Sequence, residues 1–218
     1  MRSLSLFVFT LVLLNTLFLG STLAATIKVN PNTGEDSGTC GGVAKPCKSL
    51  SQAYTNASPG DAIHLYPATY KTALDKNLGA AKPDGNVVFS KSNIAVTTDP
   101  SVTVTGVPKA IVDLDGSGIF AEFEAVTGVT VTNLVIQNGA GDGSGSGGCM
   151  KFEARATVAV ENVDFIRCQV PGNGFGSKGG TISIMNSSPT FKNCNFIESK
   201  SGVAGTIFVC VLTNTIHI

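Results

Sequence analysis

The sequence has little charge, only two histidines and no tryptophan, and its lack of a basic surplus excludes several functions. Only 14% of the 218 residues are charged, and 15 basic residues balance 15 acidic ones. A protein without a basic face cannot neutralise the phosphates of a nucleic acid or adhere by charge to an acidic membrane. We therefore expect neither a nucleic-acid partner nor a polybasic membrane-binding role.

The residues that are abundant are typical of β-structure. Hydrophobic residues make up 43% of the chain, which is too many for a disordered protein. The 25 glycines alternate with short segments that are rich in threonine, valine, isoleucine and asparagine. This composition favours strands joined by many tight turns, so the sequence predicts an all-β protein.

Residues 1–24 have the features of a secretory signal peptide. Arg2 supplies the only charge of the segment, an apolar run extends from Leu4 to Leu19, and small residues precede Ala25. A signal anchor that stays in the membrane is the alternative, and the small residues favour cleavage. No later apolar run is long enough to span a bilayer. We expect a secreted, extracellular or cell-surface protein with no transmembrane span in its mature chain.

An internal repeat predicts the architecture. Three aligned asparagines, Asn133, Asn162 and Asn193, lie 29 and 31 residues apart, and each follows an alternating strand-like segment. Glycine-led strands accompany these segments, and no helical period occurs among them. A period of about 20–50 residues is typical of a solenoid, and short strands without a helix indicate one coil of a parallel β-helix. We expect such coils over residues 61–218.

The alternation of each repeat predicts columns of inward side chains. One column contains Val131, Val160 and Phe191; a second contains Leu134, Val163 and Cys194; a third contains Ile136, Phe165 and Phe196; and a fourth contains Met150, Ile182 and Ile207. The asparagines are expected to bend the chain and to form a hydrogen-bonded ladder from coil to coil. Coincidence is the alternative explanation of the asparagine column, since asparagine is common in this sequence.

Residues 25–60 are predicted to form an N-terminal cap. Residues 25–30 alternate like a strand, and residues 48–57 carry apolar side chains at helical spacing, which gives a short helix to cover the first coil. Cys40 and Cys47 enclose a loop between these segments, so we expect a disulfide there and not a zinc site. The sequence leaves open how the other four cysteines pair: Cys149, Cys168, Cys194 and Cys210.

The C-terminal coil is expected to be incomplete. A new coil starts at Gly205 and is not followed by an asparagine bend and its strand. Because an open coil exposes its core and a strand edge, the sequence predicts a truncated chain or an edge covered by a partner.

The opening of the mature chain resembles the right-handed β-helix, pectin-lyase-like superfamily. The residues that carry the resemblance are Ile27 to Pro31, Gly34, Asp36, Cys40, Cys47, 58–63 and 67–70. Gly-Gly-Thr-Ile182 and Asn-x-x-Phe196 resemble the repeats of polymorphic outer-membrane proteins, although Cys168 and Ser199 replace the asparagine that follows phenylalanine there. The resemblance implies a right-handed β-helix scaffold, which lyases, polygalacturonases, esterases and adhesins share.

The catalytic sets of those enzymes are not found in the sequence. His64 and His217 lack the flanking glycines of a polygalacturonase, and the mature chain has only two arginines, Arg155 and Arg167. Asp164 lies near Arg167 at an ordinary outward strand position. We therefore expect no catalytic, cofactor or metal residues, and His64 is expected to be a solvated strand residue.

Two functions follow as alternatives. The first is a non-catalytic scaffold for adhesion, surface display or carbohydrate binding, with an extracellular polysaccharide or a cell-surface protein as partner. The second is a polysaccharide-active lyase or hydrolase. Asn56 and Asn186 begin glycosylation sequons that are expected on exposed turns.

Overall fold

The computed structural model describes residues 24–71, 87–141, 147–171, 179–202 and 205–210, and their strands form three sheets. Sheet A contains β1 (Thr26–Val29), β2 (Ala62–Leu65), β5 (Ala95–Thr98), β8 (Thr127–Thr132), β11 (Thr157–Glu161) and β14 (Thr190–Lys192). Sheet B contains β3 (Thr69–Lys71), β6 (Ala110–Asp113), β9 (Leu134–Gln137), β12 (Asp164–Ile166) and β15 (Asn195–Ile197). Sheet C contains β4 (Val87–Phe89), β7 (Ala121–Glu124), β10 (Met150–Glu153), β13 (Ile182–Met185) and β16 (Ile207–Cys210).

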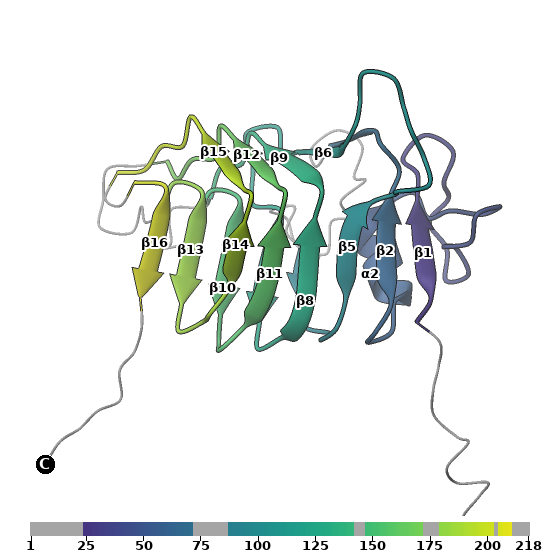
Figure 1. Ribbon diagram of the computed structural model, residues 1–218, viewed down its shortest axis with the longest axis horizontal. Helices are drawn as coiled ribbons and strands as arrows, with labels where there is room; N and C mark the ends of the chain where they lie inside the picture. Colours follow the sequence, from purple (N-terminus) through teal and green to yellow (C-terminus); the bar gives the residue numbers. More distant parts are fainter. Residues whose placement is uncertain (1–23, 72–86, 142–146, 172–178, 203–204, 211–218) are drawn as a thin grey trace, which may run out of the picture.

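From β2 onward, the chain visits the three sheets in a fixed order. Strand β8 of sheet A leads to β9 of sheet B and β10 of sheet C, and the next coil starts at β11 beside β8. Every pairing between these neighbouring strands is parallel. Figure 1 shows the coils stacked side by side along the long axis. The parallel β-helix predicted from the repeat is confirmed.

The interior consists of side-chain columns at matched registers. Val131 pairs with Val160, which pairs with Phe191, and Ile136 pairs with Phe165, as the repeat predicted. Val131, Val160, Ile136 and Phe165 are almost completely buried, while Phe191 packs against the core from a half-buried position. Cys194 is also only half-buried. The inward columns therefore extend to the last described coil, where they become partly exposed.

A column of stacked aromatic rings fills the space behind sheet C. The ring centroids of Phe89 and Phe123 are 4.8 Å apart, and those of Phe123 and Phe152 are 5.0 Å apart. Helix α2 (Leu50–Asn56) adds Tyr54 to this column, 4.7 Å from Phe89. The helix thus occupies the place that a strand of sheet C takes in later coils, and it covers the end of the aromatic column.

Helix α2 is capped at its start by a serine. Ser49 precedes the helix, and its hydroxyl accepts a hydrogen bond from the Gln52 amide at 3.1 Å. The Ser49 amide donates to Asp36 at 2.8 Å, so a loop carboxylate completes the cap. This contact also holds the segment before the Cys40–Cys47 disulfide against the start of the helix.

Two predictions concern the ends of the chain, which lie largely outside the described residues. The predicted signal peptide, residues 1–24, is described only at Ala24, and residues 211–218 of the expected incomplete coil are not described. Strand β16 itself pairs in parallel with β13, with Ile207 beside Ile182, as the glycine-led repeat predicted. Ile207 and Val209 are exposed on this last described strand, at 39% and 56%.

Candidate functional site

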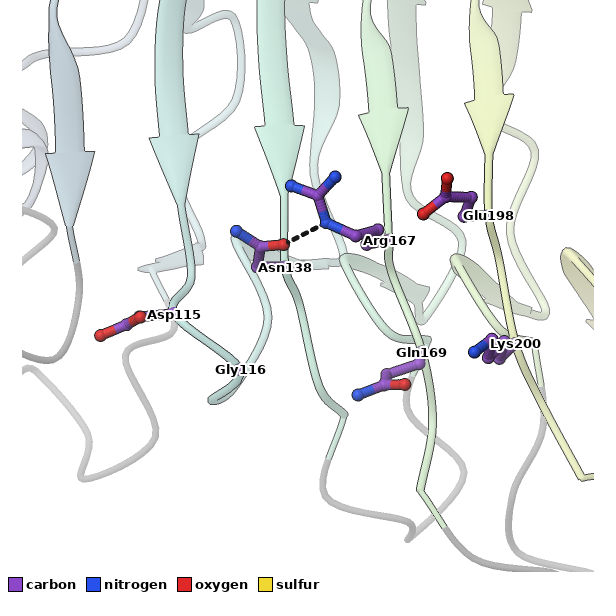
Figure 2. A pocket seen from close by; sticks show the side chains of 7 residues that line it. All are labelled: Asp115, Gly116, Asn138, Arg167, Gln169, Glu198 and Lys200. Atoms are coloured by element: carbon purple, nitrogen blue, oxygen red, sulfur yellow. Dashed lines mark hydrogen bonds between the residues drawn. The ribbon is translucent and has the colours of Figure 1, made fainter.

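The turns that leave sheet B line a polar hollow of about 320 Å³, which we call the turn pocket. Asn138, Arg167 and Glu198 each follow directly after a strand of sheet B, and all three have a left-handed backbone, with φ of 57°, 52° and 55°. Two residues further along, Gln169 and Lys200 pair across neighbouring coils. Alternate residues project on the same side, so the two rows face one hollow (Figure 2). The complete lining is Asp115, Gly116, Asn138, Arg167, Gln169, Glu198 and Lys200.

Glycines bring the turn backbones close enough to form this pocket. A Cβ atom on Gly148 would lie 2.2 Å from the carbonyl oxygen of Gly180 and 2.4 Å from the amide of Gln169. A Cβ atom on Gly180 would lie 2.7 Å from the carbonyl oxygen of Lys200. The glycine-led strands of the repeat are therefore required where one turn packs on the next, and this packing places Gln169 and Lys200 in register.

Arg167 is held in place by a chain of hydrogen bonds from sheet B. Its Nε donates to Asn138 Oδ1 at 2.8 Å, and Asn138 Nδ2 donates to Asp113 Oδ1 at 2.8 Å. Burial raises the pKa of Asp113, but hydrogen bonds from Asn138, the Asp115 amide and Gln137 outweigh it and lower that pKa below its usual value. An ionised Asp113 thus orients Asn138, which in turn holds the Arg167 guanidinium through its Nε at the lining of the pocket (Figure 2).

The pocket presents donors and acceptors along the solenoid axis. Arg167 and Lys200 supply cationic donors, Glu198 and Asp115 supply carboxylates, and Gln169 supplies an amide, all on exposed side chains. Successive coils are spaced by about 4.8 Å, the spacing of neighbouring strands. Such an array suits an extended ligand with many hydroxyl groups. Sequence analysis missed it, although Asn138, Arg167 and Glu198 have the same spacings of 29 and 31 residues as the asparagine column.

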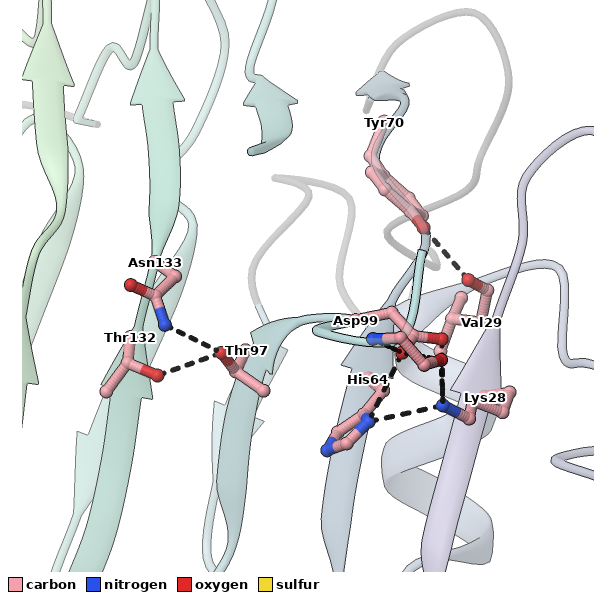
Figure 3. A network of polar contacts seen from close by, with 9 residues as sticks. Lys28, Val29, His64, Tyr70, Thr97, Asp99, Thr132 and Asn133 are labelled. Carbon is pink, nitrogen blue, oxygen red and sulfur yellow. Dashed lines mark hydrogen bonds and ion pairs between the residues drawn. The ribbon is translucent and has the colours of Figure 1, made fainter. Parts of the chain in front are cut away.

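A second polar cluster lies near the N-terminal end of sheet A and includes His64, which faces outward from its strand as expected. Lys28 Nζ lies 2.8 Å from Asp99 Oδ2 and 3.3 Å from His64 Nδ1, and His64 is 3.7 Å from Asp99 (Figure 3). His64 remains partly exposed, with 19% of its side chain accessible, and it lies between Lys28 and Thr97 of the neighbouring coils. Burial and the Lys28 charge lower its pKa, which the nearby Asp99 only partly offsets.

The outer face of sheet C carries a third cluster of charge. Lys151 lies 3.4 Å from Glu122 and 3.0 Å from Glu153. Burial lowers the pKa of Lys151, but the hydrogen bond with Glu153 and the charge of Glu122 outweigh it and raise that pKa above its usual value. Lys151 is therefore protonated at neutral pH and poorly suited to act as a general base.

Asp164 and Arg167, which were weighed as a catalytic pair, have different partners. Asp164 accepts from Lys109 Nζ at 2.8 Å and from Asn195 at 2.6 Å, whereas Arg167 binds Asn138. Asp164 is thus part of an ion pair that links the outer side of sheet B to the turn before β6.

The asparagine column occupies the bend between sheets A and B. Asn133, Asn162 and Asn193 all have a left-handed backbone, with φ of 56°, 57° and 52°. Asn162 Nδ2 donates to Asn133 Oδ1 at 2.5 Å, which is the side-chain contact that a ladder requires at its first step. The side-chain amide of Asn133, through Nδ2, also donates to the Thr97 hydroxyl at 3.4 Å, so the column contacts the preceding coil through a threonine.

The cysteines form two disulfides within the described residues. Cys40 and Cys47 are bonded, with Cα atoms 4.9 Å apart, as the sequence predicted. Cys149 and Cys168 form a second disulfide that the sequence could not identify. Cys194 and Cys210 are free thiols, half-buried and exposed respectively.

The two glycosylation sequons lie in different surroundings. Asn56 is not on an exposed turn, because it is the last residue of α2 and its amide donates to the carbonyl oxygens of Ser37 and Cys40. Asn186 lies in the bend after β13, with φ of 48° and a half-exposed side chain. Only Asn186 has the environment that was expected of both.

Metal and membrane features were also sought in the described residues. No group of three or more His, Cys, Asp or Glu side chains there is arranged to hold a metal ion. Within the same ranges, no helix is long and apolar enough to cross a membrane.

Comparisons with known proteins give one similar structure. No protein-family model and no curated protein match this chain. A solved rhamnogalacturonan lyase is similar to it, with a TM-score of 0.49 and 14% sequence identity, over 79% of this chain and 51% of the lyase. This chain thus spans about half the length of that lyase. The β-helix assignment rests on the strand pairing of this chain and not on the match.

Proposed function

We propose that this protein is a secreted, non-catalytic β-helix that binds an extracellular polysaccharide in the turn pocket. The observation that carries the proposal is the row of exposed polar side chains from successive coils, with Arg167 fixed by Asn138. Sugar hydroxyl groups pair with both donors and acceptors, and the pocket offers both. A rigid solenoid holds these groups in place before binding, which lowers the entropic cost of association.

An extracellular location has separate support. Residues 1–24 resemble a signal peptide, and the two disulfides are of the kind that persists outside the cytosol. The repeats also resemble those of polymorphic outer-membrane proteins, which favours adhesion or surface display as the setting in which the polysaccharide is bound.

The alternative function, a lyase or hydrolase, has weaker support from the charged clusters. A lyase needs a base near its substrate, and the pKa of Lys151 is raised by Glu153 and Glu122. Lys28 and Lys109 are likewise held by Asp99 and Asp164, each at 2.8 Å. These contacts favour structural roles for the three lysines.

The test is binding of the secreted protein to an array of plant, fungal and bacterial polysaccharides, followed by calorimetry on those bound. Arg167→Gln should weaken binding by about tenfold, a typical loss for one charged hydrogen-bonding group. Arg155→Gln is the matched control, because Arg155 is exposed, also has a left-handed backbone (φ 67°) and does not line the pocket.

Two outcomes would overturn the proposal. Equal effects of the two substitutions would place binding outside the turn pocket. Release of unsaturated or reducing ends from a bound polysaccharide, measured with and without Ca²⁺, would replace the non-catalytic function with the enzymatic one.

A further inference from the structure

A separate hollow of about 350 Å³ lies at the N-terminal end of the β-helix, away from the turn pocket. Three segments surround it: the end of β1, the loop that the Cys40–Cys47 disulfide closes, and the turn after β5. Its volume is at the lower end of the range for small-molecule sites, about 300–1,000 Å³. We call it the N-terminal hollow.

The walls of this hollow are fixed by hydrogen bonds. The disulfide loop is bonded to β1 through the Lys28 amide, which donates to Gly41 O at 2.7 Å, and through the Asn30 amide, which donates to Cys47 O at 2.8 Å. The buried Tyr70 hydroxyl contacts Val29 O and Tyr66 O, each at 3.1 Å (Figure 3). A cavity with bonded walls is preorganised for a ligand.

One side of the hollow is apolar. Val43 is 85% exposed at the tip of the disulfide loop, where it contributes little to the core. Ala44, Pro46 and Val102 add further apolar surface, and Tyr66 also lines the hollow. An exposed valine on a rigid loop beside other apolar side chains is a feature of binding surfaces and is not required by the fold.

The other side is polar and electrically balanced. Asp99 is only 5% exposed, and both of its oxygens are engaged, by Lys28 at 2.8 Å and by the Ser101 hydroxyl at 2.6 Å. A charged ligand would have to separate Lys28 from Asp99 and leave a buried charge without its partner, which is costly. Asp99 Oδ1 already accepts from both the amide and the hydroxyl of Ser101, so a neutral ligand can use the remaining lone pair of Oδ2 and the side-chain NH2 of Asn30, and it leaves the ion pair intact.

We propose that the N-terminal hollow binds one neutral pyranose sugar. Such a ring has an apolar face of C–H groups, which suits the side of Val43 and Pro46, and a rim of hydroxyls, which suits the side of Asp99. A free monosaccharide and the terminal residue of a polysaccharide offer the same chemistry. This site goes beyond the proposed function, because it lies on different coils and takes a single ring.

The test is a titration of the isotope-labelled secreted protein with neutral monosaccharides, followed by amide NMR signals. Saturable shifts should be confined to residues 28–30, 43–46 and 99–102, and the matching uronic acids should bind about tenfold or more weakly. Short oligosaccharides capped at either end distinguish a free monosaccharide from the terminal residue of a polysaccharide as the natural ligand. If a chain end is the natural ligand, they bind tighter than the monosaccharide, and only when the correct end is free.

Val43→Asp should weaken monosaccharide binding by about tenfold or more, because it places a carboxylate on the apolar wall. Thr39→Asp is the matched control, since it adds the same charge to an exposed position directly before the same loop and outside the hollow. Arg167→Gln should leave this binding unchanged, so failure here is distinguishable from failure of the turn pocket. Equal binding of uronic acids, equal effects of the two aspartate variants, or no saturable shift with any neutral sugar would each overturn the proposal.

Discussion

Phe123→Ala tests whether the aromatic column is a main source of stability. Phe123 is completely buried and stacks on Phe89 and Phe152, with centroids 4.8 and 5.0 Å away. Truncating a core phenylalanine costs about 3–5 kcal/mol. Each lost ring pair adds about 0.5–1.5 kcal/mol beyond the buried area. We therefore expect a loss near 5 kcal/mol, which is as large as the whole stability of many domains, about 5–15 kcal/mol.

The matched control is Phe196→Ala in the last described coil. Phe196 is only half-buried and stacks face to face on one ring, Phe165, at 5.1 Å. Because its burial is partial, its removal should cost about 1–2 kcal/mol. Urea unfolding followed by circular dichroism measures both values by linear extrapolation. Equal losses for the two variants, or a loss below about 2 kcal/mol for Phe123→Ala, would refute the reasoning.

Three further predictions concern pH, a disulfide and glycosylation. Burial and a nearby lysine lower the pKa of His64 in the folded protein. The free energy of unfolding, measured with urea, should therefore fall as the pH drops below 6.5, where the unfolded protein binds the proton more tightly. His64→Gln should remove this loss. Replacing Cys149 and Cys168 by serine should cost about 3 kcal/mol, since their bond spans 19 residues, and an unchanged urea midpoint would contradict this. In a eukaryotic secretory host, peptide mass mapping should find a glycan on Asn186 and none on Asn56, whose amide is bonded within the fold.

The fold could be predicted because a β-helix places equivalent residues in the same environment. Val131 and Val160 recur at one register since each coil must bury the same edge, and Asn133 and Asn162 recur because each bend needs a left-handed backbone. Periodicity alone therefore locates inward columns and bends. Helix α2 could likewise be predicted from the helical spacing of its apolar side chains.

Contacts between residues that do not recur from coil to coil could not be predicted from the sequence. Lys28 meets His64 and Asp99, which are 36 and 71 residues away, and only the winding of the chain brings them together. Cys149 lies directly before a strand of sheet C, and Cys168 lies two residues after a strand of sheet B in the next coil. Each of these pairings is decided by coil stacking, and short-range sequence pattern carries no information about it.

The turn pocket was missed for a different reason, which concerns how a solenoid carries function. Asn133, Asn162 and Asn193 repeat both backbone and side chain, and the first two bond to each other. The column after sheet B repeats the left-handed backbone, but its side chains differ, being asparagine, arginine and glutamate. Asn138 and Arg167 are also bonded to each other, but the varied column adds a cationic and a carboxylate side chain to the lining of the pocket, which a column of asparagines does not have. In this fold, a ligand site is therefore to be sought where the backbone repeats and the side chains do not.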